Sequence, residues 1–288
     1  MRNFIFLFLI STLYFSCSSE EEDTSLDTSV VFEELNLSYG TDVKQKYDVY
    51  LPPNRSASTT DVIVLVHGGS WVGGDKSDVT DLVDVIQEIL PDYAVVNMNY
   101  RLTSGMNYPL TDQLNDVDNF MVHIDEESDY YGISDSYVMI GVSAGGHMIL
   151  QHSYSRNDNR KIKVACNIVG PTYFLDPSYI ESEIQSFQLL AGSFQLLTGV
   201  PITDTEFYDA ISPLKQVSSS SVPTIQFFGS EDELIPITQG PLLAAALDAV
   251  NVPNEITIYE GEGHGWADPL NWLDTFQKIE AFISLHVN

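Results

Sequence analysis

Short apolar runs recur along this chain of 288 residues, and helix-length segments separate most of them. Runs such as "VIVLV", "YVMIG" and "TIQFF" are typical of strands buried on both faces of a sheet. The strands predicted from these runs are Val31–Leu37, Tyr47–Leu51, Val62–Val66, Ala94–Asn99, Tyr137–Gly141, Lys163–Val169, Thr224–Phe228 and Glu255–Tyr259. The predicted helices are Asp78–Leu90, with Ser77 as its cap, Leu110–Ile124, Ala144–Ser153, Pro241–Val250 and Trp272–His286. The alternation predicts an α/β fold, with a mostly parallel eight-stranded sheet and helices on both faces.

One interval, 171–213, breaks this alternation. It contains many aromatic and aliphatic residues but no clean strand, and it falls between two predicted core strands. A long connection inside a compact domain usually has a function. We therefore expect a small helical lid-like insertion over a site, and an ordinary surface connection is the alternative.

The charge balance excludes one class of function. The chain has 41 acidic and 12 basic residues, which gives a formal net charge of −29. A field of this sign repels the phosphates of nucleic acids, so nucleic acid is not an expected partner. The acidity is most simply a property of the surface, because 44% hydrophobic residues leave enough apolar side chains for a large core.

The N-terminal segment predicts export. Arg2 carries the only early positive charge, and the apolar run that follows it is too short for a stop-transfer helix, so 1–16 is expected to be a signal peptide. The stretch "YFSCSSEEED" resembles a bacterial lipoprotein signal, which implies that Cys17 is lipidated and that 17–30 is an acidic tether. The tether resembles those of outer-membrane lipoproteins exposed at the cell surface. Ordinary signal cleavage without lipid is the alternative.

The second cysteine, Cys166, lies in the apolar run "KVACNIVG" and is expected to be a small buried core residue. If Cys17 carries lipid, Cys166 has no partner for a disulfide. The sequence contains no cysteine–histidine cluster and no phosphate-binding loop, so it implies neither a metal nor a cofactor.

The motif Gly-x-Ser-x-Gly occurs at Gly141–Gly145, between a predicted strand and a predicted helix. In this context a sharp turn exposes the serine hydroxyl, and the flanking glycines avoid clashes in the turn. Ser143 is therefore the predicted nucleophile, and it needs a base and an acid later in the chain. His264 in "EGHGW" and Asp232 in "SEDELIP" each follow a predicted strand, and Glu231 and Glu233 are rivals for the acid.

The other histidines are expected to have structural or surface positions. His147 and His152 lie five residues apart on one helix, which places them about 140° apart around its axis, so they cannot form a metal pair. His67, at the start of "HGGSW", is expected to be structural although it is conspicuous. His123 and His286 are expected at the surface or in packing contacts.

The stretches "HGGSW", "GVSAGG", "SEDELIP" and "GHGW" together resemble α/β-hydrolase-fold serine esterases, particularly the carboxylesterase and feruloyl-esterase-like branch with an HGGxW motif. The resemblance covers 31–288, which it implies is one catalytic domain. It implies an oxyanion hole formed by the N–H groups of Gly69, Ser70 and Ala144. Ser70 stands where related lipases have a third glycine, but a backbone donor at that position does not require glycine.

The expected activity is hydrolysis of carboxylic esters through an acyl-enzyme, with short-chain, acetyl or feruloyl esters, free or linked to polysaccharide, as substrates. Trp71 is expected to border the substrate, and Tyr173, Phe174, Phe187 or Phe194 could form an apolar acyl pocket or simply pack within the lid. The alternatives are a peptidase or amidase of the same fold and a non-catalytic binding lipoprotein. The lipid on Cys17 would be the only membrane contact.

Overall fold

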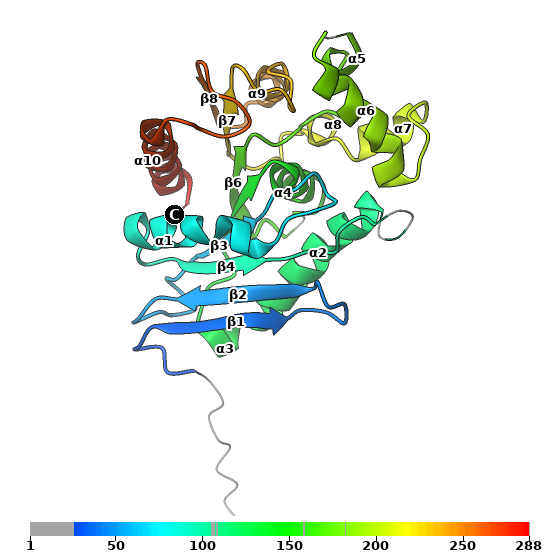
Figure 1. The fold of residues 1–288 in the computed structure, drawn as a ribbon. Helices are drawn as coiled ribbons and strands as arrows, with labels where there is room; N and C mark the ends of the chain where they lie inside the picture. Colours follow the sequence, from blue (N-terminus) through cyan, green and yellow to red (C-terminus); the bar gives the residue numbers. More distant parts are fainter. Residues whose placement is uncertain (1–25, 105–106, 108, 158, 182, 288) are drawn as a thin grey trace, which may run out of the picture.

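The computed structural model describes residues 26–104, 107, 109–157, 159–181 and 183–287, so Cys17 and most of the predicted tether lie outside the described residues. Eight strands form one sheet in the order β1-β2-β4-β3-β5-β6-β7-β8 (Figure 1). The strands are β1 Phe32–Ser38, β2 Lys46–Leu51, β3 Val62–Val66, β4 Ala94–Met98, β5 Tyr137–Val142, β6 Ile162–Ile168, β7 Thr224–Gly229 and β8 Asn254–Tyr259. Strands β3 to β8 are parallel, and β1 and β2 pair antiparallel at one edge. Each strand agrees with its prediction to within one residue at both ends, and the predicted α/β-hydrolase fold is confirmed.

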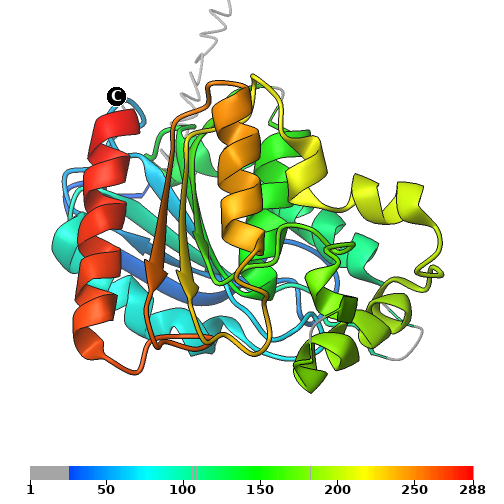
Figure 2. The same cartoon turned by 90° about the horizontal axis from the view of Figure 1, so that it is seen from above.

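Helices cover both faces of the sheet (Figures 1 and 2). They are η1 Lys76–Val79, α1 Thr80–Ile89, α2 Leu110–Glu126, α3 Ser128–Tyr131, α4 Ala144–Ser155, α5 Ser178–Glu181, α6 Gln185–Thr198, α7 Thr205–Ala210, α8 Pro213–Gln216, α9 Gln239–Ala249 and α10 Pro269–His286. Side chains from α1 and α10 pack on one face of the sheet, and those from α2, α4 and α9 pack on the other. The helices α5, α6 and α7, together with the start of α8, occupy the interval 171–213.

Strand β3 shows why the runs are continuously apolar. All five of its residues are buried, because the strand is covered on both faces. Val62, Val64 and Val66 contribute to the core under α2 and α4, while Ile63 and Leu65 contribute to the core under α1 and α10. Two packed faces therefore favour an apolar side chain at each of these five positions.

The expected cap at Ser77 is wrong. The Asp75 carboxylate instead accepts a hydrogen bond from the Ser77 backbone N–H (3.1 Å), and Asp78 accepts one from the Asp75 backbone N–H (3.0 Å). In this reciprocal arrangement Asp75 is the cap of the 3₁₀ turn Lys76–Val79, two residues before the predicted cap, and Ser77 lies inside the turn.

Candidate active site

Ser143 lies in the sharp turn between β5 and α4. Its backbone has φ 54° and ψ −119°, a left-handed conformation that L-residues seldom adopt. A Cβ at Gly145 would lie 2.1 Å from the carbonyl oxygen of Val66, and one at Gly141 would lie 2.4 Å from that of Gly145. The two glycines therefore allow α4 to start directly against the end of β3, which fixes the position of the serine.

His264 and Asp232 come from the loops after β8 and β7. His264 Nε2 is 2.8 Å from Ser143 Oγ, and His264 Nδ1 is 2.7 Å from an Asp232 carboxylate oxygen. The other Asp232 oxygen accepts backbone N–H bonds from Leu234 (2.7 Å) and Ile235 (2.9 Å). The Asp232 side chain is 1% exposed, so the carboxylate is held in one orientation between these donors. The structure thus brings Ser143, His264 and Asp232 into one hydrogen-bonded chain.

The rival acids do not join this chain. The side chains of Glu231 and Glu233 are exposed on the acid loop, which we define as residues 230–236. They flank Asp232 in sequence, but the Asp232 side chain is buried whereas theirs are open to solvent. Only Asp232 of the three carboxylates is hydrogen-bonded to His264 among the described residues.

The loop after β3 approaches Ser143 from the other side. Gly69, Ser70 and Trp71 all have positive φ, at 116°, 52° and 63°. Within the described part of the chain, the backbone N–H groups of Gly69 and Ser70 donate to no protein acceptor. Ala144 is the first residue of α4, where an N–H has no acceptor within the helix. The three residues expected at the oxyanion hole therefore carry N–H groups that are available to a bound group.

Trp71 does not line an open site, contrary to our expectation. Its side chain is 1% exposed and packs at ring-centroid distances of 5.5 Å from His147 and 5.7 Å from Phe174. Its carbonyl oxygen accepts hydrogen bonds from Gln113 Nε2 (2.7 Å) and the Thr103 backbone N–H (2.9 Å). Trp71 therefore supports the loop from inside, where the core buries it.

Phe174, Phe187 and Phe194 are also buried within the insertion, at 5% exposure or less. Phe174 and Phe194 pack edge to face at 4.8 Å, and Tyr179 packs on both Phe187 and Phe194. Of the two roles weighed for these aromatic residues, the structure favours lid packing. Tyr173 is partly buried beside the Lys215 ammonium group, 4.8 Å from its ring centroid.

His67 and His147 are structural, as expected. His67 is fully buried, stacks on Tyr100 at 4.3 Å, and has its pKa lowered by burial. His147 Nε2 is 2.8 Å from the Ile211 carbonyl oxygen, and burial lowers its pKa to about 4. His147 therefore joins α4 to the end of the insertion as a neutral ring.

Cys166 is a fully buried core residue, in agreement with the sequence, and burial raises the pKa of its thiol. A neutral, inaccessible thiol is a poor nucleophile. No group of three or more His, Cys, Asp or Glu side chains is arranged to hold a metal ion within the described ranges.

Sequence reasoning missed Glu262, two residues before His264. Its carboxylate accepts hydrogen bonds from the Ala267 N–H (2.5 Å), the Asp268 N–H (3.0 Å) and Asn271 Nδ2 (2.7 Å). These three donors lower the pKa of Glu262. Its backbone carbonyl also accepts the Glu231 N–H (2.8 Å), so Glu262 connects the loop that carries His264 to the acid loop and to the start of α10. The position of Glu262 only two residues before the predicted base His264 is the sequence feature that could have indicated its role in holding this loop.

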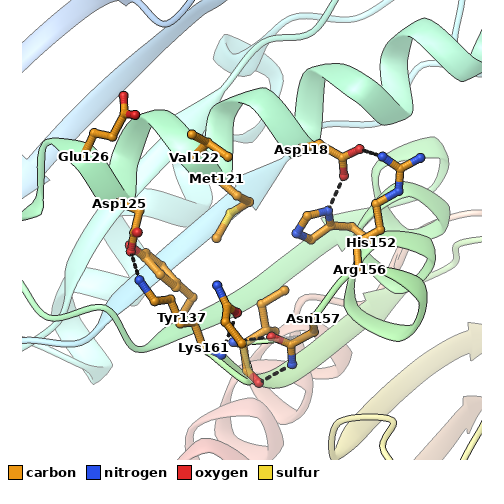
Figure 3. A pocket seen from close by; sticks show the side chains of 12 residues that line it. Asp118, Met121, Val122, Asp125, Glu126, Tyr137, His152, Arg156, Asn157 and Lys161 are labelled. Atoms are coloured by element: carbon orange, nitrogen blue, oxygen red, sulfur yellow. Dashed lines mark hydrogen bonds and ion pairs between the residues drawn. The ribbon is translucent and has the colours of Figure 1, made fainter.

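A hollow away from the site of Ser143 lies between α2, α4 and the start of β6, with a volume of about 380 Å³ (Figure 3). There Asp118 accepts a hydrogen bond from His152 Nδ1 (2.6 Å) and pairs with Arg156, while Lys161 pairs with Asp125. His152 lies nine residues after Ser143 on α4, or about 13 Å along the helix. The hollow is therefore at the far end of α4, where Arg156 and Lys161 pair with two of its three carboxylates and Glu126 is the third.

The protein has the α/β-hydrolase fold. Its strand order, the turn at Ser143 and the loops that meet at one edge of the sheet are the features that define this fold. The chain belongs to the BD-FAE family, whose model matches residues 47–247. No helix of the described residues is long and apolar enough to cross a membrane.

Three curated relatives are esterases by name. The chain is 23% identical to isoprenylcysteine alpha-carbonyl methylesterase ICME of Arabidopsis thaliana, with 80% of this chain and 56% of the relative covered. It is 23% identical to esterase LipC of Mycobacterium tuberculosis (79% and 58% covered) and 26% identical to versiconal hemiacetal acetate esterase of Dothistroma septosporum (69% and 64% covered). The chain spans about half the length of the first curated relatives that it matches.

Solved structures show the same fold. A bifunctional GH43-CE protein of Bacteroides eggerthii has a TM-score of 0.73 at 19% identity, covering 92% of this chain and 39% of that chain. A truncated carbohydrate esterase from gut microbiota has a TM-score of 0.70 at 17% identity, with 90% and 98% covered. Est2 of Thermogutta terrifontis with bound propionate has a TM-score of 0.68 at 18% identity, with 90% and 95% covered.

Proposed function

We propose that this protein is a serine esterase that hydrolyses carboxylic esters through an acyl-enzyme on Ser143. The observation that carries this proposal is the position of the His264 imidazole, hydrogen-bonded to Ser143 Oγ on one side and to Asp232 on the other. A serine hydroxyl attacks a carbonyl only when a base takes its proton, and this arrangement supplies the base and its orienting acid.

In the first step, Ser143 Oγ bonds to the ester carbonyl carbon while His264 Nε2 takes the hydroxyl proton. The resulting imidazolium lies against the Asp232 carboxylate, whose negative charge stabilises it. The carbon–oxygen bond to the alcohol then breaks, and the alcohol leaves with the proton from His264. Water then attacks the acyl-enzyme while His264 takes one of its protons, and the bond between the acyl carbon and Ser143 Oγ breaks as His264 returns the proton to Oγ and the acid leaves.

The tetrahedral intermediate places a negative charge on the former carbonyl oxygen. The available N–H groups of Gly69, Ser70 and Ala144 are the proposed donors to this oxygen. One such donor is typically worth about 3 kcal/mol in the transition state. Because all three are backbone groups, the side chain of Ser70 has no part in this step.

We further propose short-chain acyl esters, including acetyl or feruloyl esters of polysaccharide, as the substrates. This proposal is supported by the family match and by similarity to structures described as a carbohydrate esterase and as a propionate-bound esterase. The names of the curated relatives favour esters over the alternative of peptide or amide bonds.

Labelling with a fluorophosphonate probe tests the proposal. The purified protein should become labelled and should hydrolyse p-nitrophenyl acetate, and Ser143→Ala should abolish both properties while retaining the fold. An exposed serine such as Ser58 provides the control, because Ser58→Ala should change neither. Full activity in the Ser143→Ala variant would refute the assignment, and failure of the native protein to be labelled would favour the non-catalytic alternative.

Export and lipidation rest on the sequence, because 1–16 and Cys17 lie outside the described residues. We propose that signal cleavage leaves Cys17 as a lipidated N-terminus and that the protein is an outer-membrane lipoprotein. Mass spectrometry of the N-terminal peptide from membranes should find a diacylglyceryl group on Cys17. An N-terminus at another residue, without lipid, would support ordinary cleavage instead.

A further inference from the structure

An apolar cleft of about 560 Å³ lies beside the loop that carries Gly69 and Ser70. Among the residues that the structure describes, none of those that line the cleft has an ionisable side chain, although the chain as a whole is strongly acidic. They are Val72, Thr103, Pro109, Gln195, Leu196, Leu197, Thr198 and Gly199. An uncharged lining of this kind suits the apolar part of a neutral ligand.

The cleft is close to the proposed oxyanion site. The backbone N–H of Val72 donates to the Gly69 carbonyl oxygen (3.1 Å), so these two residues close a tight turn. The Cα atoms at the two ends of such a turn lie within about 7 Å of each other. The Val72 end of the cleft is therefore near Gly69, whose N–H is one of the proposed oxyanion donors.

A described residue on each side of the cleft is held by hydrogen bonds before a ligand binds. On one side, Thr103 is joined to Trp71 by a backbone hydrogen bond of 2.9 Å and to Gln113 by its hydroxyl (2.9 Å). On the other side, the Thr198 hydroxyl donates to the Phe194 carbonyl oxygen (2.9 Å) and contacts the Tyr208 hydroxyl (2.9 Å). Such walls need little ordering on binding.

Two large apolar side chains at the cleft are nevertheless open to water. Val72 is 54% exposed and Leu196 is 74% exposed. Leu196 lies near the end of α6, whose first turn reaches the acid loop through a hydrogen bond from Ser186 Oγ to the Glu233 carbonyl oxygen. Helix α6 therefore extends from the acid loop to the loop of the proposed oxyanion site, and covering Leu196 would remove apolar surface from water.

We propose that this cleft binds the apolar group of an uncharged ester and that Val72 and Leu196 determine selectivity for it. The inference rests on the proposed esterase function and makes it more specific, because it predicts that the site accepts neutral esters with a medium-length alkyl or an aryl group in addition to the short-chain esters proposed above. A small acetyl ester contacts little of this surface. Changes in the cleft should therefore alter kcat/KM for long-chain esters more than kcat/KM for acetyl esters.

The first test measures the ratio of kcat/KM for p-nitrophenyl octanoate to that for p-nitrophenyl acetate. Val72→Asp and Leu196→Asp should lower this ratio at least about tenfold, and Leu196→Ala should lower it less, because a pocket discriminates by the apolar surface it offers. The controls are Leu189→Asp, two turns away on α6 and 67% exposed, and Leu285→Asp on α10, 66% exposed. Both controls should keep the native ratio. An unchanged ratio in Leu196→Asp, or an equal loss in Leu189→Asp, would overturn the proposal.

The second test does not depend on turnover. Calorimetry should detect binding of 4-phenyl-2-butanone, a neutral ketone analogue of an ester, to the Ser143→Ala variant. Adding Leu196→Asp should weaken this binding at least about tenfold, and 4-phenylbutanoate should bind to neither protein. Equal affinity for the ketone with and without Leu196→Asp would refute the proposed role of the cleft in binding the apolar group. Absence of ester hydrolysis by the native protein, together with normal ketone binding, would refute the esterase proposal alone.

Discussion

The hydrogen bond between His264 and Ser143 joins residues 121 positions apart in the sequence. It forms because parallel strands place all their carboxyl ends at one edge of the sheet, where the loops after β5, β7 and β8 meet. Each proposed catalytic residue could be predicted from the sequence because it lies within five residues of the end of a strand. The burial of Trp71 could not, because it depends on α4 and on Phe174, which are distant in the sequence.

At the residue scale, Asp232→Asn should lower kcat by about ten-thousand-fold. The asparagine carbonyl would accept the Leu234 and Ile235 N–H groups, which leaves its amide N–H₂ facing His264 Nδ1. Nδ1 would then have to accept a hydrogen bond, so Nε2 would carry a proton and could not take the one from Ser143. Steady-state kinetics on p-nitrophenyl acetate measures the loss.

The matched control for this substitution is Glu233→Gln on the same loop, whose exposed side chain should leave kcat unchanged. A loss of less than tenfold in Asp232→Asn would contradict the role given to Asp232.

At the scale of elements, the loop that carries His264 is held by Glu262. A folded-state pKa below the ordinary value means that the carboxylate stabilises the fold at pH values above its unfolded pKa, and that this contribution is lost as pH falls through the folded pKa. Glu262→Gln should therefore lower the midpoint of thermal unfolding most at neutral pH, and the difference from the native protein should shrink on acidification. Calorimetric scans over a pH series measure this difference.

The same substitution should lower kcat, because a neutral amide accepts fewer hydrogen bonds from Ala267, Asp268 and Asn271 than the carboxylate does and so holds the loop of His264 less firmly. Glu88→Gln, at an exposed position on α1, should change neither property. A thermal difference that does not vary with pH would rule out the proposed titration of Glu262.

The strands and the five predicted helices could be read from the sequence, as could the helical character of the insertion, whereas the bounds of α5, α6 and α7 could not. The runs of β3 to β7 are apolar because both faces are covered, and this leaves a local signal. In the insertion, Phe174, Phe187 and Phe194 pack on one another and on Tyr179, so their roles depend on contacts made only after folding. The sequence pattern therefore indicated a helical insertion and not its internal packing.

At the scale of the whole molecule, the net charge of −29 should repel anionic esters. For p-nitrophenyl hemisuccinate, kcat/KM should rise several-fold between about 0.01 M and about 1 M salt, because the screening length falls from about 30 Å to about 3 Å. For neutral p-nitrophenyl acetate it should stay nearly constant, and this substrate is the internal control. The same salt response for both esters would show that bulk charge does not affect encounter with the substrate.

The left-handed backbone of Ser143 implies a trade-off between stability and reactivity. A non-glycine residue in such a conformation costs about 1–3 kcal/mol, while a glycine loses up to about 1 kcal/mol more chain entropy on folding. Ser143→Gly should thus raise the unfolding midpoint by about 2–4 °C relative to Ser143→Ala, which lacks the hydroxyl but keeps the strain. Differential scanning calorimetry of the two inactive variants measures the net stability that the native turn gives up to expose its hydroxyl, and equal midpoints would show that the strain does not exceed the entropy cost of glycine, about 1 kcal/mol.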